Sequence, residues 1–189
     1  MGQPTLPDKV RKIHGRLRLK GIPHAFGGAL ALAYYAEPRV TIDIDLNVFV
    51  EPGQAAPVFD TLSDLGADTS TDLAALERRG QCRIWWGRTP LDLFFAYDPI
   101  HDAMQAEIRT VPFGDATIPI LAPEHLAACK LGFDRPKDWI DIEQMLICVE
   151  HFDTVELLAW SDRIVGKDDP RAERIRELVA RTRGGEQPG

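Results

Sequence analysis

Two aspartates interrupt an apolar run at residues 41–50, TIDIDLNVFV. Because successive side chains of a strand point to opposite faces, Asp43 and Asp45 would project together, in line with Thr41. Ile42 and the other apolar residues would take the opposite face and enter a core. Two adjacent carboxylates on a half-buried sheet repel each other and lose solvation, so they need a partner. The simplest partner is a divalent cation, and the run predicts a metal-binding strand.

Two other interpretations of this run have to be weighed. The first is a solvated strand face, because alternation of polar and apolar residues is common in half-exposed sheets. The second is a calcium loop, since Asp43, Asp45 and Asn47 have the spacing of the first three EF-hand ligands. That loop needs glycine next and glutamate at its twelfth position, where this chain has Val48 and Gln54. The calcium loop is therefore disfavoured.

A double glycine precedes the aspartates. Gly27 and Gly28 separate the short apolar segment PHAF from ALALAYYA, which has good helix formers and no helix breaker. Glycine lets the backbone approach a ligand closely, and the free amides of a helix N-terminus attract phosphate. Taken alone, the pair is equally typical of a tight turn. Together with an aspartate strand one short helix later, it predicts a triphosphate beside metal ions.

These residues resemble a known family. FGG followed by TIDIDL is similar to the signature of the nucleotidyltransferase superfamily, which joins a glycine turn to an Asp-x-Asp strand. A later stretch, APEHLAACKLGFDRPKDWIDIEQML, resembles the lysine and Arg-Pro-Lys-Asp-x-x-Asp segment of the bacterial AbiEii and MenT-like toxin branch. The resemblance covers roughly residues 22–148, and the two motifs in this order are more specific than either alone.

The resemblance implies an α/β (α+β) fold: a mixed sheet with flanking helices and a helical C-terminal part. It also implies an enzyme that moves a nucleoside monophosphate from a nucleoside triphosphate to an acceptor hydroxyl, with two Mg²⁺ ions (Mn²⁺ as the alternative) and release of pyrophosphate. In the toxin branch the acceptor would be the 3′ end of tRNA, and a cognate antitoxin would be a partner. A small molecule of the aminoglycoside type and a protein are alternative acceptors. A catalytically degenerate nucleotide-binding protein is a further alternative.

The resemblance implies a third carboxylate, which would share a metal with the aspartate pair and could accept the proton of the attacking hydroxyl. Asp92, between Leu91 and Leu93 in LDLFFAY, repeats the pattern of an aspartate inside an apolar strand. It is preferred to Asp98, which precedes a proline and is typical of a turn or helix cap. The alternative for Asp92 is a polar residue on an exposed strand face. The predicted metal ligands are Asp43, Asp45 and Asp92.

The cationic side of the predicted site comes from CKLGFDRPKDWIDI. Lys130 lies one helical turn after Leu126, at the margin of an apolar face along which a lysine can reach a phosphate. By resemblance, Lys130 matches the phosphate-binding lysine of the family, Lys137 is a second cation candidate and Asp141 matches an acidic site residue. Asp141 could instead orient Lys130 or Lys137 through an ion pair. A loop between two helices with paired charges is the alternative for this stretch, above all for Arg135 and Asp138.

Two residues just before the aspartates complete the prediction. The resemblance implies that a basic residue at Arg39 faces the triphosphate, and that a hydroxyl residue at Thr41 can be phosphorylated by the antitoxin. A phosphate there would put about −2 of charge beside the metal site. From the residues alone, Thr41 is simply a good strand former. The predicted nucleotide-binding set is Gly27, Gly28, Arg39, Thr41 and Lys137; the catalytic set is Asp43, Asp45, Asp92, Lys130 and Asp141.

With 189 residues, 44% of them hydrophobic, the chain can bury one sizeable core, or one core with a helical extension, and one compact unit is expected. The expected organisation is a core over residues 1–122, a helical part over 123–183 and a flexible tail over 184–189. We find no signal peptide and no apolar run near the length of a membrane span. A cytoplasmic protein without a membrane partner is expected.

Charge is unevenly distributed around the net value of −7. Residues 1–20 carry six basic and one acidic side chain, and residues 163–183 carry seven basic and four acidic ones. Residues 21–162 hold nine basic and 23 acidic side chains. Basic ends could contact RNA phosphates while an acidic centre holds Mg²⁺. Equally, they could be the solvated faces of two amphipathic helices.

The remaining patterns predict the elements that must position these residues. Hydrophobic periodicity and caps predict helices over 8–19, 28–36, 55–65, 100–107, 123–132, 137–149, 154–165 and 170–182, and strands over 23–26, 41–50, 81–86, 91–97, 109–113 and 117–121. GRTP is the expected turn between the third and fourth strands. Asp153 with Glu156 has the spacing of a helix cap, as does Asp169 before Pro170.

Overall fold

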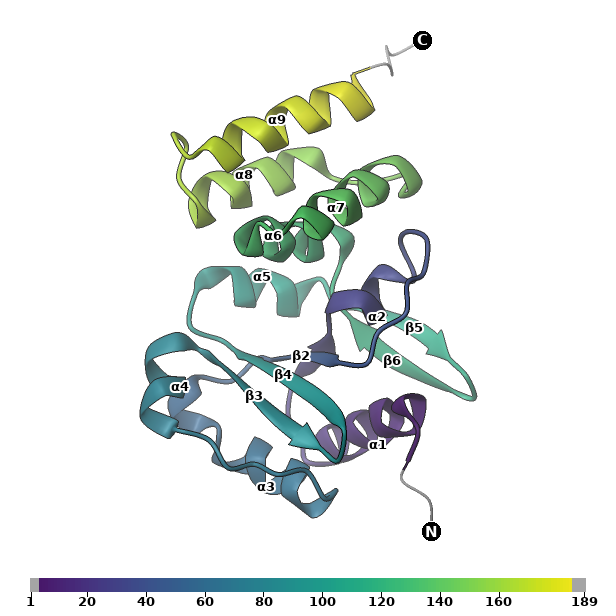
Figure 1. Ribbon diagram of the computed structural model, residues 1–189, viewed down its shortest axis with the longest axis vertical. Helices are drawn as coiled ribbons and strands as arrows, with labels where there is room; N and C mark the ends of the chain where they lie inside the picture. The colour runs from purple at the N-terminus through teal and green to yellow at the C-terminus, as the bar shows by residue number, and fades with distance from the viewer. Residues whose placement is uncertain (1–3, 185–189) are drawn as a thin grey trace. The chain divides into compact units, whose positions relative to one another are not determined.

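The computed structural model describes residues 4–184 and contains a six-stranded mixed sheet, labelled in Figure 1. The strands are β1 (His24–Phe26), β2 (Ile44–Val48), β3 (Gln81–Trp86), β4 (Thr89–Phe95), β5 (Arg109–Phe113) and β6 (Ala116–Ile120). Their order is β3-β4-β2-β1-β6-β5. The β2–β4 and β1–β6 pairs are parallel, and the other three pairs are antiparallel. The expected mixed sheet is confirmed.

Nine α-helices are found among the described residues: α1 (Leu6–Leu19), α2 (Gly28–Leu32), α3 (Ala56–Asp64), α4 (Leu73–Arg79), α5 (Pro99–Ala106), α6 (Pro123–Phe133), α7 (Pro136–Cys148), α8 (Thr154–Ile164) and α9 (Pro170–Arg183). A 3₁₀ turn covers Pro52–Gln54. Most bounds lie within two residues of those expected from periodicity. The exceptions are α2, which is shorter than predicted, β2, which begins later, and α4, which was not predicted.

The chain divides into two compact units. The first comprises the chain up to Leu30 together with Val40–Leu121, and so holds the sheet. The second comprises Ala31–Arg39 together with the chain from Ala122 on, and holds α6 to α9. Residues 31–39, assigned to the core in the sequence analysis, thus belong to the helical unit. Apart from Gly184, the expected tail lies outside the described residues.

Helix α1 illustrates how sequence patterns build the first unit. Thr5 caps the helix in a reciprocal box with Asp8, and three buried residues one turn apart line its inner face: Val10, Ile13 and Leu17. Lys9 is also buried, with only 3% of its surface exposed. Its Nζ donates to the carbonyl oxygen of Trp86 at 2.7 Å and to Oγ1 of Thr89 at 2.9 Å. This cation therefore ties α1 to the β3–β4 hairpin.

The apolar face of the central strands forms the core of the same unit. The buried cross-strand pairs are Ile44 with Leu91, Leu46 with Leu93, and Val48 with Phe95. Burying each such side chain contributes about 1.5–3 kcal/mol. Because side chains alternate along a strand, this buried face fixes which polar residues point the other way.

The helical unit follows the expected caps. Asp153 accepts a hydrogen bond from the Glu156 amide at 2.9 Å at the start of α8. Asp169 accepts one from the Arg171 amide at 2.9 Å, with Pro170 in the first turn of α9.

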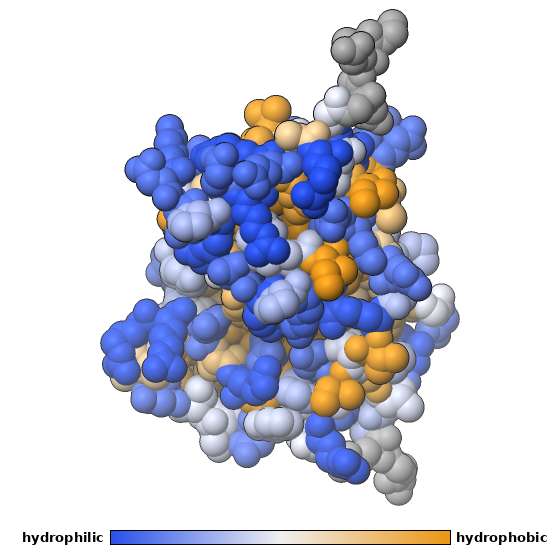
Figure 2. Space-filling view, turned by 45° about the horizontal axis from the view of Figure 1, so that its top comes forward, coloured by the Kyte–Doolittle hydropathy of each residue, from blue (hydrophilic) through white to orange (hydrophobic). Residues whose placement is uncertain are grey.

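On the face shown in Figure 2, hydrophilic side chains predominate and apolar ones form small separate patches. Within residues 4–184, no helix combines the length and the apolar character needed to cross a membrane.

Candidate active site

The strand register brings two of the predicted carboxylates side by side. Asp45 on β2 lies directly opposite Asp92 on β4 in the parallel pair. On the other side, Arg83 of β3 lies opposite Asp92 in the antiparallel pair. Residues opposite each other in register point to the same face of a sheet, so Arg83, Asp92 and Asp45 form one row across three strands.

Asp43 lies close to this row but outside the strand, which corrects the prediction of a strand from residue 41. In the observed register Asp43 would face Pro90, which has no N–H to donate to a ladder, and β2 begins only at Ile44. Asp43 is held instead by Thr41, whose hydroxyl donates to the Asp43 carboxylate. Ile42, expected in the core, is 71% exposed.

The double glycine is packed directly against the polar face of β2. The Gly27 amide donates to the Asp45 carbonyl oxygen at 3.0 Å, and a Cβ on Gly27 would lie 2.9 Å from Nδ2 of Asn47. Gly28 has a φ of +54°, and a Cβ there would lie 1.7 Å from Oδ2 of Asp45. Only glycine fits this position. The following helix, α2, has five residues rather than the nine expected, so a helix N-terminus contributes less here than predicted.

Arg83 is a site residue that the sequence analysis did not identify. Its Nε and Nη2 donate to Oδ1 and Oδ2 of Asp92 at 2.6 and 2.7 Å, a bidentate pair. The hydrogen bond with Asp92 raises the pKa of Arg83, and the charges of Asp92, Asp43 and Asp45 act in the same direction. The Arg83 side chain is 52% exposed, whereas Asp92 is 18% exposed. The carboxylate row therefore has a cation of its own within the first unit.

The predicted cationic residues meet in the second unit. Nζ of the buried Lys130 lies 2.6 Å from Oδ2 of Asp141 and 3.7 Å from Oδ1 of Asp138. Nη2 of Arg39 reaches the same Asp141 oxygen at 3.3 Å, and Nε of Arg135 lies 2.6 Å from Asp138. The ion pair between Lys130 and Asp141, one of the two alternatives for Asp141, is present.

The α6–α7 connection explains why these charges converge. Lys130 is in the last turn of α6, the left-handed Asp134 reverses the chain, and Asp138 and Asp141 follow in the first turns of α7. Three basic side chains, Arg39, Lys130 and Arg135, thus pair with two carboxylates, Asp138 and Asp141, in this cluster. Lys137, the second predicted cation, is exposed and stands apart from these pairs.

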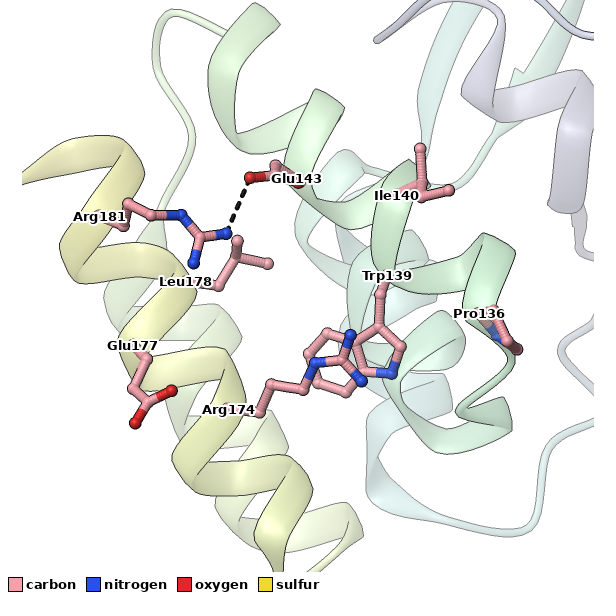
Figure 3. Close-up of a pocket in the computed structure, with 8 residues that line it drawn as sticks. All are labelled: Pro136, Trp139, Ile140, Glu143, Arg174, Glu177, Leu178 and Arg181. Atoms are coloured by element: carbon pink, nitrogen blue, oxygen red, sulfur yellow. Dashed lines mark hydrogen bonds and ion pairs between the residues drawn. The ribbon is translucent and has the colours of Figure 1, made fainter.

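A cavity of about 260 Å³ lies between α7 and α9, also in the second unit (Figure 3). Its lining residues are Pro136, Trp139, Ile140, Glu143, Arg174, Glu177, Leu178 and Arg181, and none of them belongs to the predicted site. The Arg174 guanidinium lies over the Trp139 ring at 3.9 Å, and Arg181 pairs with Glu143 at 2.8 Å. These α9 arginines thus contact side chains of α7, which favours the interpretation of α9 as an amphipathic structural helix.

Comparisons with known proteins place the fold. No protein-family model and no curated protein matches the sequence. The antibiotic-resistance factor ANT(2'')-Ia matches with a TM-score of 0.55 and 16% identity, over 97% of this chain and 94% of that one. An antigenic nucleotidyltransferase-like protein from Paracoccidioides brasiliensis matches at 0.57 and 13%, over 95% and 88%. The lincosamide antibiotic adenylyltransferase LnuA matches at 0.53 and 15%, over 76% and 98%. The chain has a nucleotidyltransferase-like fold.

Proposed function

We propose that this protein is a Mg²⁺-dependent nucleotidyltransferase, which moves a nucleoside monophosphate from a nucleoside triphosphate to an acceptor hydroxyl and releases pyrophosphate. The observation that carries the proposal is the row in which Asp45 and Asp92 are direct neighbours, with Asp43 two residues before Asp45. Such a concentration of carboxylates is costly unless cations bind it.

The donor set fits a hard divalent cation. Asp43, Asp45 and Asp92 offer only carboxylate oxygens, which suit Mg²⁺ or Mn²⁺. The close packing of Gly28 on the Asp45 carboxylate gives that ligand a fixed position. A bound Mg²⁺ would neutralise phosphate charge and make the acceptor hydroxyl more acidic.

The protein side chains take the remaining roles in this proposal. Asp92 accepts the proton of the acceptor hydroxyl. Lys130 and Arg39 supply positive charge for the triphosphate, and Asp141 orients both through the contacts described above. Thr41 donates to the Asp43 carboxylate, so a phosphate on Thr41 would remove that donor and add negative charge beside Asp43. That is the route by which an antitoxin would switch the enzyme off.

For the acceptor we propose the 3′ end of tRNA, in the role of the toxin of a toxin–antitoxin system. The support is the resemblance of the Lys130 to Asp141 segment to the AbiEii and MenT-like branch. Helix α1 also presents three exposed basic side chains that could meet an RNA backbone: Lys12, Arg16 and Arg18.

A hydroxyl of a small molecule is the second candidate acceptor. It is favoured by the match to ANT(2'')-Ia, an antibiotic-resistance factor, over nearly the whole of both chains. The internal pairing of the α9 arginines points the same way, because it leaves less basic surface for RNA.

The test is a transfer assay with each of the four α-labelled nucleoside triphosphates, Mg²⁺ and, in separate reactions, total tRNA, an aminoglycoside or a lincosamide. We expect one triphosphate to label tRNA. Asp43→Asn and Asp45→Asn should each abolish labelling, whereas Asp60→Asn on the exposed side of α3 should not. If only an antibiotic were labelled, a small molecule would replace tRNA as the proposed acceptor. Label in none of these acceptors with any triphosphate would refute transfer to tRNA and to these antibiotics.

A further inference from the structure

Arg83 engages both oxygens of Asp92. The two hydrogen bonds, at 2.6 and 2.7 Å, use the matched fork of the guanidinium and the carboxylate. In this arrangement the lone pairs that point toward Arg83 are not free for a metal. A cation that takes Asp92 as a ligand from that side has to displace the guanidinium.

The surroundings of the two side chains show which one can move. Asp92 is fixed within β4, between Asp45 on one side and Arg83 on the other, and its side chain is 18% exposed. The Arg83 side chain is 52% exposed, and arginine has a long flexible stem. Arg83 can therefore turn to solvent or to a phosphate oxygen while Asp92 stays in place.

The negative charge of the row explains why Asp92 has a basic partner such as Arg83. Asp45 and Asp92 are register neighbours and Asp43 lies two residues from Asp45, so without a cation their mutual repulsion would spread the carboxylates apart. Arg83 is the basic residue of the same row. It compensates part of this charge before a divalent ion arrives.

We infer that Arg83 is a displaceable counter-ion, which holds Asp92 in its binding orientation and competes with the divalent cation for that carboxylate. This inference rests on the proposed function, because it takes Asp92 as a metal ligand. Arg83 then sets the metal concentration at which the site loads. In this role it is a positioning residue.

The test measures Mn²⁺ binding to the nucleotide-free protein by calorimetry and by electron paramagnetic resonance, independently of transfer. Arg83→Gln should bind Mn²⁺ about tenfold more tightly than the unmodified protein, the scale of one well-formed charge-assisted pair. Arg83→Lys keeps the charge but loses the fork, so its affinity should fall between the two. Arg88→Gln, in the turn of the same hairpin, removes an exposed arginine that the structure does not pair with Asp92, and should leave the affinity unchanged.

A double-mutant cycle with Asp92→Asn separates competition from a general field effect. In the Asp92→Asn background, Arg83→Gln should no longer tighten Mn²⁺ binding. If Arg83→Gln still tightened Mn²⁺ binding in the Asp92→Asn background, the counter-ion role would be overturned. It would also be overturned if Arg83→Gln alone bound Mn²⁺ no more tightly than the unmodified protein. Either result would leave the proposed metal site standing. If no variant bound Mn²⁺, including the unmodified protein, the metal site of the proposed function would fall and the inference with it.

Discussion

Replacing Gly28 by alanine should disable the site by displacing a ligand. At a φ of +54° an L-residue is strained by about 1–2 kcal/mol. The new Cβ would also lie 1.7 Å from Oδ2 and 2.4 Å from Cγ of Asp45, far inside any contact that real Cβ atoms make. Because the Asp45 backbone is paired with β4 on one side and accepts a hydrogen bond from the Gly27 amide on the other, its side chain is the part that must turn away.

Both stability and activity are expected to change, by different amounts. The free energy of unfolding should fall by about 1–2 kcal/mol, since the side chain can relieve the clash but not the backbone strain. Transfer should fall by about a hundredfold or more, because a displacement of about 1 Å in a positioned group costs that much. Urea unfolding followed by circular dichroism gives the first quantity, and the labelled-triphosphate assay gives the second.

Two further glycines provide the controls. Gly15→Ala, inside α1, meets nothing within 4 Å and should stabilise the protein by about 0.5–1 kcal/mol with unchanged transfer. In Gly27→Ala the new Cβ meets Nδ2 of Asn47 at 2.9 Å, which is the movable end of a side chain. Its stability and transfer activity should therefore lie between those of Gly28→Ala and Gly15→Ala. Full transfer by Gly28→Ala would show that the observed position of the Asp45 carboxylate is not needed for the reaction.

Three other outcomes are expected. Lys130→Ala should lower the free energy of unfolding by about 3–5 kcal/mol, because it leaves the buried Asp141 without its closest cation. The control Lys137→Ala should change that free energy little. Equal free energies of unfolding for the two variants in urea titrations would contradict the buried network. Burial lowers the pKa of His24 to about 4 from 6.5, so the unfolded chain binds the proton first and stability should fall by about 3 kcal/mol from pH 6.5 to pH 4. His24→Phe should flatten that part of the stability–pH curve, and an unchanged slope would assign it to other groups. Thr41→Glu should weaken binding of the nucleoside triphosphate by about tenfold while Thr41→Val does not, because the added negative charge repels the phosphates, and equal affinities would exclude charge-based control at this position.

The order of elements and the polar face of the sheet could be predicted because they rest on local rules. Alternation identifies the buried faces of β2 and β4, and proline with an aspartate cap fixes the start of α9. The signals for α4 were equally local. Asp72 caps that helix and Gly80 ends it in the left-handed region, so the sequence itself contains the signals for α4.

The Arg83–Asp92 pair was missed because the turn was placed two residues too long. GRTP, as a four-residue turn, would put Trp85 opposite Asp92. The structure turns at Gly87 and Arg88 alone, which makes Arg83 the partner. Register in a hairpin follows from loop length, so a small error in the turn changes every cross-strand pair. The cross-strand attraction of opposite charges could have corrected it.

The choice of partners around Lys130 could not be predicted from spacing. The sequence offers two acidic residues on the first turns of α7, and which one binds Lys130 depends on how α6 and α7 pack around Asp134. That packing places Asp141 at 2.6 Å and Asp138 at 3.7 Å from the lysine Nζ. It also brings in Arg39, which lies 102 residues before Asp141 in the sequence and which no local rule connects to α7.

The two clusters differ in composition. In the first unit, Asp43, Asp45 and Asp92 lie with Arg83, which pairs with Asp92. In the second, Lys130, Arg39 and Arg135 pair with Asp138 and Asp141. Internal pairing in both clusters also limits the cost of burying these charges before the substrate arrives.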